Sequence, residues 1–474
     1  MNKTAVTVVD AVMGTGKSTW VALKIKEEQS RYVVVLPRLT ELERYEELLE
    51  GLEGVVSLRD DKEQGKSQSK RELFKEALVD AQVILITHAL FENYLTPDTF
   101  EIIGEGEWSL IMDEVITAFE PVKGVTDTDI IGLIGKQVMR REPVKGKVAR
   151  LVPDPGMAAC YRAAPATEAS KAQKHFVGAA QIKDVYAIEN DNGKDFMAFS
   201  LREERLNAFK DVIILTYPFK DTDLDYWFQV KGWKVEHMKL TRETKTNSLD
   251  DYKLTSHDGQ YSGKEFAELI ELVNVEQRGV RPHERYGTKP GHFSATDSKK
   301  RLVMKKGGNV GKEVQQIRKA LRREFRHPKD RSRRVDPGDF MFSCRKECIP
   351  VWAEPKNSLS KAFIGRDTWV AFNTRGINDH AHRHHLAFLY NVFPQPEIEK
   401  TVQAFDLNYN RDQYALHVLI QWVWRSAIRK GERIRLYLPS DRMRRILLEW
   451  LRVPHWGMLE KNVRENRALR CLYI

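Results

Sequence analysis

The stretch that decides the fold reads AVTVVDAVMGTGKST over residues 5–19. Its first part is apolar and β-branched, which predicts a buried strand over Ala5–Val9. A glycine loop follows, and the pattern after it predicts a helix over Ser18–Glu28. A strand, a glycine loop and a helix in this order are typical of a loop that wraps phosphates, because glycine lets consecutive N–H groups point inward.

This loop predicts a nucleotide site that holds phosphates together with Mg²⁺. Lys17 supplies a mobile positive charge to the β and γ oxygens, and Ser18 offers a hydroxyl to magnesium. Ala11 stands where the first glycine of such loops is usual, and alanine is the smallest substitute. The residues expected to hold the nucleotide are Met13, Gly14, Thr15, Gly16, Lys17, Ser18 and Thr19.

A second motif supplies acids for the same site. Leu110-Ile-Met-Asp113-Glu114 is an apolar strand that ends in two carboxylates. One carboxylate can hold magnesium while its neighbour orients or deprotonates the attacking water. We assign Asp113 to the metal and Glu114 to the water.

The surrounding sequence alternates strand and helix patterns, which is typical of a parallel sheet with crossover helices. Further strands are predicted over Tyr32–Leu36, Val83–Thr87 and Val212–Thr216, and a further helix over Thr40–Leu52. The sequence therefore predicts an α/β fold with a doubly wound sheet.

A chain of 474 residues exceeds the size at which single cores stop growing, so two domains are expected. We predict a first domain over residues 1–225, with an insertion at about 120–205, and a second over 226–474, with a basic insertion at about 256–337.

The composition indicates a polyanionic partner. Lys and Arg outnumber Asp and Glu by 77 to 67, a net charge of +10, although such a charge can also serve solubility alone. Between Lys299 and Arg334 the excess is local, with fifteen Lys or Arg against three acids. Val314, Ile317, Leu321 and Phe325 form one apolar helical stripe there. Such a helix can dock on the fold and offer Arg318, Arg322, Arg323 and Arg326 to phosphates, unless it is merely a solvated face.

Other compartments and ligands are not expected. The four cysteines are scattered and give no disulfide framework, which fits a reducing cytoplasm. Cys344 and Cys348 lack a second Cys/His pair at zinc-like spacing. Asp10 interrupts the only short apolar stretch near the N-terminus, so no signal peptide is expected, and no run approaches the ~18 apolar residues of a membrane span.

The order of these motifs resembles superfamily 2 helicases of the DEAD/DEAH type, with Asp113-Glu114-Val115-Ile116 in the place of the box. The resemblance implies two RecA-like domains with parallel sheets and ATP as the nucleotide bound with Mg²⁺. It also implies nucleic-acid contacts at Arg38, in Leu36-Pro37-Arg38, and at Thr87 and His88. Thr216 lies where that family couples hydrolysis to movement, although Tyr217 replaces the usual alanine.

The resemblance also implies an arginine that reaches the γ-phosphate from the second domain. Gln421, Arg425 and Arg429 resemble motif VI of the family and would share one helical face, but the second arginine comes one residue late. Asn373–Asn378 resembles motif V. The histidines at 380, 382, 384 and 385 favour a solvated or nucleic-acid-facing helix start over a metal site.

The expected function is a nucleic-acid-dependent ATPase that translocates on or unwinds its strand, with DNA expected in preference to RNA. The segments Phe372–Pro394 and Ile420–Leu451 resemble helicases encoded by tailed bacteriophages, which implies phage replication or recombination in the host cytoplasm, with other replication proteins as further partners. Two alternatives stay open: a terminase-like packaging ATPase with a nuclease domain, which needs several acids at strand ends in the second domain, and a nucleotide-binding scaffold with little turnover.

Overall fold

The computed structural model describes residues 3–28, 30–59, 70–167, 169–190, 195–302, 310–325, 334–352, 366–372 and 379–453. The chain forms two compact units. The first contains Met1–Gly259 and Pro394–Tyr409, and the second contains Gln260–Phe393 and Asn410–Ile474. Each unit has a sheet with parallel strands and flanking helices, which confirms the predicted α/β fold with two RecA-like parallel sheets.

Within the described residues, the first unit is built on an eight-stranded sheet. Its strands in spatial order are β13 (Tyr252–Ser256), β12 (Val235–Arg242), β1 (Ala5–Asp10), β11 (Asp211–Thr216), β5 (Ser109–Asp113), β2 (Tyr32–Leu36), β4 (Val83–Thr87) and β3 (Val55–Ser57). All neighbours pair in parallel except the edge strand β13, which is antiparallel to β12. The carboxyl ends of β1, β11 and β5 therefore lie side by side at one edge.

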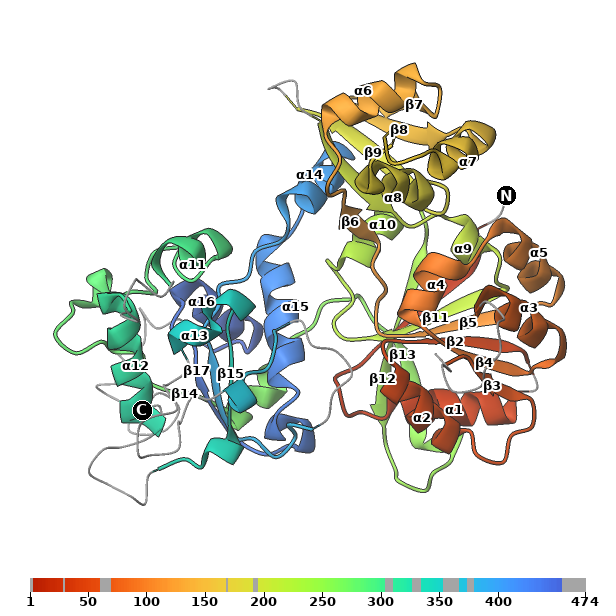
Figure 1. The fold of residues 1–474 in the computed structure, drawn as a ribbon. Coiled ribbons are helices and arrows are strands. Elements are labelled where there is room, and N and C mark those ends of the chain that lie inside the picture. The colour runs from red at the N-terminus through yellow and green to blue at the C-terminus, as the bar shows by residue number, and fades with distance from the viewer. Residues whose placement is uncertain are drawn as a thin grey trace. The chain divides into compact units, whose positions relative to one another are not determined.

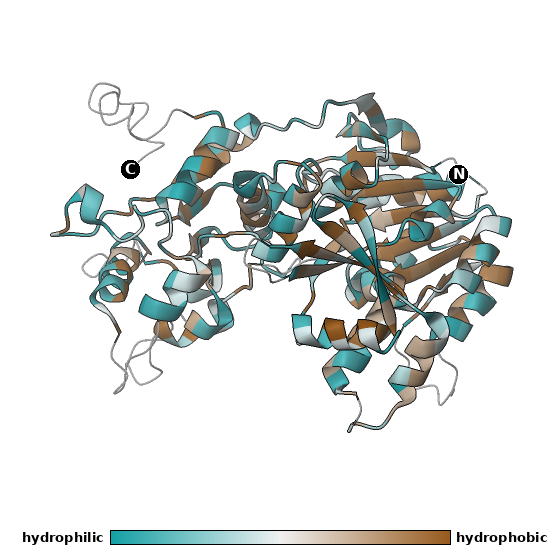
Figure 2. Ribbon diagram, turned by 90° about the horizontal axis from the view of Figure 1, so that it is seen from above, coloured by the Kyte–Doolittle hydropathy of each residue, from teal (hydrophilic) through white to brown (hydrophobic). Residues whose placement is uncertain are grey.

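Helices cover both faces of this sheet, whose central strands are apolar along their length (Figure 2). The helices α1 (Lys17–Glu27) and α2 (Leu39–Leu48) pack on one face, where Ile25 and Leu42 join the core. The helices α3 (Lys70–Asp80), α4 (His88–Tyr94) and α5 (Pro97–Glu105) lie on the other side (Figure 1). The predicted strands and the two predicted helices are present, with ends shifted by a few residues.

The boundary between the units differs from the predicted one at residue 225. β12 pairs in parallel with β1, where Val6 lies opposite Val235, and β13 continues the sheet. Hydrogen bonding therefore keeps the chain in the first unit as far as Gly259, and Pro394–Tyr409 returns to it.

The segment predicted as an insertion at about 120–205 forms a five-stranded antiparallel sheet of its own. Its strands in spatial order are β6 (Phe119–Pro121), β10 (Asp195–Ser200), β9 (Asp184–Glu189), β8 (Val148–Pro153) and β7 (Met139–Lys145). Alternation along β9 sends Val185 and Ala187 to one core, and Tyr186 and Ile188 to another.

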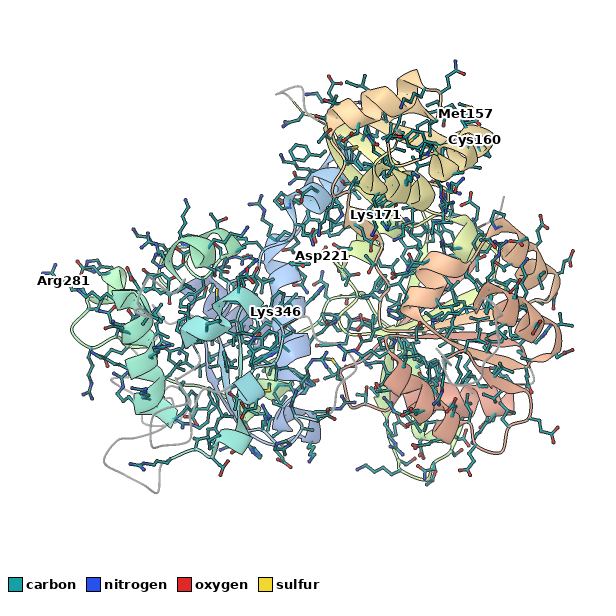
Figure 3. The ribbon with its side chains drawn as sticks, in the orientation of Figure 1. Met157, Cys160, Lys171, Asp221, Arg281 and Lys346 are labelled. Carbon is teal, nitrogen blue, oxygen red and sulfur yellow. The ribbon has the colours of Figure 1, made fainter. Side chains whose placement is uncertain are left out.

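Helices cover both faces of this inserted sheet (Figure 1). They are α6 (Asp127–Gly135), α7 (Pro155–Ala163) and α8 (Lys171–Ala180) on one face and α14 (Pro396–Ala404) on the other. Met157 and Cys160 are exposed on α7 (Figure 3). The insertion is thus a folded layer whose second face is completed by chain from beyond residue 390.

Among the residues described in the second unit, four strands form a sheet whose pairings are parallel. Its order is β14 (Ile270–Leu272), β17 (Ile434–Tyr437), β16 (His385–Phe388) and β15 (Phe340–Ser343). Its helices, in chain order, are α11 (Ala295–Arg301), α12 (Lys312–Phe325), α13 (Ile349–Trp352), α15 (Arg411–Val423) and α16 (Asp441–Trp450).

The basic segment predicted as an insertion at about 256–337 is part of this unit's framework. It contributes β14 to the sheet, where Ile270 lies opposite Ile434. It also contributes α12, whose predicted apolar stripe is confirmed, because all four of its residues are fully buried in the core. The prediction that this segment is an insertion is therefore wrong for the parts that form β14 and α12.

Candidate nucleotide site

The loop between β1 and α1 has the backbone that wrapping a phosphate requires. Gly14 and Gly16 have φ of 96° and 91°, in the left-handed region where a residue with a Cβ is strained. Trp20 donates its amide to the Gly16 carbonyl at 2.8 Å, which starts α1 directly after the loop. The helix therefore presents its unpaired N–H groups and the positive end of its dipole at the carboxyl edge of the sheet.

A hydrogen bond joins the loop helix to the acid strand. Ser18 Oγ donates to Asp113 Oδ2 at 3.0 Å, and both residues are buried. The two residues assigned to magnesium on sequence grounds are therefore adjacent, although 95 positions separate them. A hydroxyl and a carboxylate at this distance are oxygen donors of the kind magnesium prefers.

Two residues that sequence reasoning did not connect with the acid strand hold Asp113 in place. Tyr45, fully buried on α2, donates its hydroxyl to Asp113 Oδ2 at 3.0 Å. Burial and the charge of Asp113 raise the pKa of Tyr45 well above its ordinary value, so the hydroxyl keeps its proton. The His88 ring nitrogen Nε2 lies 3.1 Å from the Asp113 carbonyl oxygen.

Glu114 lies at a bend directly after β5. Its φ of 73° is unusual for a residue with a side chain, and its amide donates to the Leu215 carbonyl at 2.9 Å. This bond fastens the bend to β11, one residue before Thr216. The backbone thus leaves the strand direction at the second acid.

The strand β11 lies between the loop strand and the acid strand, and Thr216 is buried at its end. The Thr216 carbonyl accepts the amide of Ala11 at 3.1 Å. Asp10, which is fully buried at the end of β1, accepts the amide of Phe219 at 2.9 Å. The chain after β11 is therefore tied to the end of β1 through the Thr216 carbonyl and the Asp10 carboxylate.

Lys17 projects back over its own loop. Its amino group bonds the carbonyl oxygens of Ala11 and of Val12, the latter at 3.3 Å. Thr15 Oγ1 also donates to the Val12 carbonyl, at 2.6 Å. Nucleotide phosphates would compete with these carbonyls for the lysine, because a doubly charged oxygen group attracts an ammonium more strongly than a neutral carbonyl does.

The residues predicted to contact nucleic acid in the first unit stand at the carboxyl edge of the same sheet. Arg38 is the N-cap residue of α2, just after β2, and is half-buried. Thr87 ends β4, where its hydroxyl accepts the Leu90 amide at 3.3 Å and caps α4. Thr87 thus has a structural task that its sequence context did not indicate.

The four arginines predicted on α12 differ in their surroundings. Arg318 donates to the Val351 carbonyl, and Arg323 donates to the Glu276 carbonyl at 2.9 Å, so both help to dock the helix. Arg322 is exposed, as is Lys319, which the sequence argument did not single out. Arg326 lies outside the described residues.

The motif predicted to supply a γ-phosphate arginine is not one continuous helix. α15 ends at Val423, and Arg429 lies in a separate 3₁₀ turn, Ala427–Lys430. The prediction that Gln421, Arg425 and Arg429 share a helical face is therefore wrong. Arg425 is 6% exposed, whereas Gln421 and Arg429 are half-buried. Residues 373–378, which resemble motif V, lie outside the described part of the chain.

The predicted helix start at histidines 380, 382, 384 and 385 is not a helix, since His385 begins β16. His384 contacts Asp339 at 2.9 Å through Nδ1 and Glu432 at 2.7 Å through Nε2, and His385 contacts the other Asp339 oxygen at 2.9 Å. Partial burial lowers the pKa of His384, but the two carboxylates outweigh it and raise that pKa above its ordinary value. Burial raises the pKa of Asp339, but hydrogen bonds from both histidines bring it down to about 2.

The fold and the loop together define an α/β protein with two RecA-like units and a nucleotide-type loop in the first. A family model described as the YonV C-terminal Rossmann-like domain matches residues 264–451. The chain is similar to the SPbeta prophage-derived uncharacterized protein YonV of Bacillus subtilis (strain 168), with 23% identity over 455 residues that cover 94% of this chain and 98% of that protein.

Similarity to solved structures is low. The structure of S. tokodaii Xpd4 aligns over 95% of both chains with 13% identity and a TM-score of 0.44. The crystal structure of the DUF1998 helicase MrfA bound to DNA and AMPPNP aligns over 98% of this chain and 55% of that chain, with 9% identity and a TM-score of 0.26.

Proposed function

We propose that this chain is an ATP-dependent nucleic-acid motor, a helicase or translocase related to superfamily 2. The observation that carries the proposal is the hydrogen bond of 3.0 Å between Ser18 and Asp113 beside a loop with two left-handed glycines. A glycine turn without a nucleotide-binding role would not require a serine hydroxyl and a strand-end carboxylate to lie together at the start of a helix.

The residues present fit ATP and magnesium. The amides of the loop and of the first turn of α1 would bind the β-phosphate, and Lys17 would bind the β and γ oxygens. Ser18 and Asp113 would hold the metal. Bound magnesium would neutralise charge that builds on the phosphates during transfer.

The chain's own groups would carry the rest of the reaction. Glu114, which follows Asp113 at a bend with φ of 73°, would orient the attacking water and accept its proton. Arg425 or Arg429 of the second unit would stabilise charge on the γ-phosphate, with Gln421 beside them. Thr216 would pass the state of the site to the rest of the unit through the Ala11 backbone.

The proposed substrate is a nucleic-acid strand, DNA in preference to RNA, and the proposed setting is phage replication or recombination with other replication proteins. The net charge of +10 and the exposed cations of α12 support a polyanionic partner. The prophage origin of the YonV relative supports a phage setting. No helix in the described residues is long and apolar enough to cross a membrane.

The terminase-like alternative has less support. A nuclease of that kind needs several carboxylates where the strands of the second unit end. The two residues that follow each of its four described strands are Val273-Asn274, Cys344-Arg345, Leu389-Tyr390 and Leu438-Pro439, none of which is acidic. The alternative of a nucleotide-binding scaffold with little turnover does not explain why Glu114, a second acid, follows Asp113 at a strained backbone position.

ATP turnover tests the proposal. The wild-type chain and the Lys17→Ala variant would be assayed alone and with single-stranded DNA, duplex DNA and RNA. We expect nucleic acid to stimulate the wild type and Lys17→Ala to abolish turnover, because the charge on the β and γ oxygens is lost. Turnover of the variant within about tenfold of wild type, or ~1.4 kcal/mol in barrier height, would overturn the assignment.

A further inference from the structure

The hairpin formed by β12 and β13 extends past the carboxyl end of the loop strand. Asp10, the last residue of β1, lies opposite Lys239 of β12, and β12 continues for three more residues to Arg242. Tyr252, the first residue of β13, lies opposite Arg242. The end of the hairpin is therefore level with the phosphate loop and lies beside α1 (Figure 1).

A buried carboxylate fixes the connection between the two strands. Asp251 is fully buried and accepts hydrogen bonds from Thr246 Oγ1 at 2.6 Å and from the Asn247 amide at 2.8 Å. Thr244 Oγ1 donates to the same carboxylate. Because the next residue is Tyr252, this network sets where the tyrosine begins the strand.

Tyr252 lies directly against the phosphate loop. A Cβ built on Gly16 would be 2.7 Å from Tyr252 Oη and 3.2 Å from the ring carbon Cε1. The hydroxyl is buried and has no hydrogen-bond partner within the described residues. The guanidinium carbon of Arg242 lies 5.3 Å from the centre of the tyrosine ring. Since buried polar groups are almost always bonded, this hydroxyl is a donor available to a group bound beside the phosphate loop.

The order of strands identifies which part of a nucleotide would reach Tyr252. The acid strand β5 lies on one side of β1, beyond β11, and marks the metal end of the site. The hairpin lies on the other side of β1. If the γ-phosphate faces Asp113, the sugar and base would lie on the side of β1 away from β5, where the hairpin is.

We propose that Tyr252, supported by Arg242, binds the nucleoside half of the nucleotide, with its hydroxyl hydrogen-bonded to the sugar or the base. The inference rests on the proposed ATP site and adds to it the element that recognises more than phosphates. Gly16 must lack a side chain in part because Tyr252 occupies the space beside it.

Binding of two probes tests this role. MgATP and inorganic tripolyphosphate, which has the phosphates without the nucleoside, would be titrated into the wild type and Tyr252→Phe. We expect the variant to lose about tenfold in affinity for ATP, the worth of one hydrogen bond, and to bind tripolyphosphate as wild type does. The decisive quantity is the ratio of the two affinities.

The matched control is Tyr32→Phe. It removes a hydroxyl that bonds Glu28, just after the far end of α1, at 2.6 Å, so the ratio should not change. An unchanged ratio in Tyr252→Phe, whether both affinities fall together or neither falls, overturns the proposal. Lys17→Ala separates this result from failure of the site itself, because it should weaken binding of both probes; if it weakens neither, the phosphate loop assignment fails.

Discussion

Tyr45 offers a test of the proposal that Asp113 holds the metal. Its hydroxyl donates to Asp113 Oδ2 at 3.0 Å from a fully buried position on α2. Tyr45→Phe removes the donor and keeps the ring, so packing is preserved while Asp113 loses the partner that orients it. Ser18 then remains as the side-chain donor seen on that oxygen.

The magnitude follows from the nature of the bond. A hydrogen bond to a charged group is worth about 1.5–3 kcal/mol, and losing the partner of a metal ligand costs about 10–100-fold in metal affinity. We expect the lower end, about tenfold, because Ser18 still bonds the carboxylate. The assay is a magnesium titration of ATP turnover, in which the half-saturating concentration of free Mg²⁺ should rise while maximal turnover falls less.

Tyr226→Phe is the matched control. Tyr226 is also buried in the first unit, and its hydroxyl donates to Asp221 at 3.1 Å rather than to the acid strand. Both variants should lose some thermal stability, but only Tyr45→Phe should change the magnesium requirement. Equal half-saturating magnesium in wild type and Tyr45→Phe would refute the idea that this hydroxyl positions a metal ligand.

Three other predictions concern separate parts of the chain. Glu114→Gln should keep its affinity for MgATP but lose nearly all ATP turnover. If Glu114→Gln instead lost nucleotide binding while Asp113→Asn kept turnover, the metal-binding and water-activating roles of the two acids would have to be exchanged. Replacing exposed Lys319 and Arg322 by Gln should reduce the steepness with which log affinity for duplex DNA falls against log salt concentration, by about 0.9 per lost phosphate contact. An unchanged slope would mean that the exposed face of α12 is only solvated. The pKa of His384 is raised, so the stability that its charged form contributes is present below about pH 6.5 and is lost as pH rises through the raised pKa. The melting temperature should therefore fall more between pH 6 and 9 in wild type than in His384→Gln. Parallel melting curves for the two proteins would contradict this.

The parts of the fold that sequence could predict are those fixed by local chemistry. A buried strand, two glycines at positions of positive φ and a lysine at a helix start occupy one short stretch, so AVTVVDAVMGTGKST specifies its own loop. The apolar stripe of α12 was predictable for the same reason, because helical periodicity depends only on neighbouring residues.

Partners brought together by tertiary packing could not be predicted. Tyr45 reads in the sequence as one apolar position of an amphipathic helix, and nothing in its neighbourhood marks the hydroxyl that contacts Asp113. The predicted domain boundary at residue 225 differs from the structure for the same reason, because the pairing of β12 with β1 joins residues more than 200 positions apart in the sequence. Asp339 meets His384 only because β15 and β16 are neighbours in the sheet.

The arginines of the second unit show why a family spacing can mislead. The amide of Arg425 bonds the Trp422 carbonyl at 3.2 Å, and Ser426 Oγ donates to the Val423 carbonyl at 2.7 Å, so α15 tightens and stops where the motif expects it to continue. The one-residue delay before Arg429 therefore falls in a turn, where helical phase no longer decides which side chains share a face. Arg425 is 6% exposed and Arg429 is half-buried, so the two arginines differ in their surroundings. Measuring ATP turnover of Arg425→Ala beside Arg429→Ala decides between them, because the larger loss identifies the proposed γ-phosphate arginine.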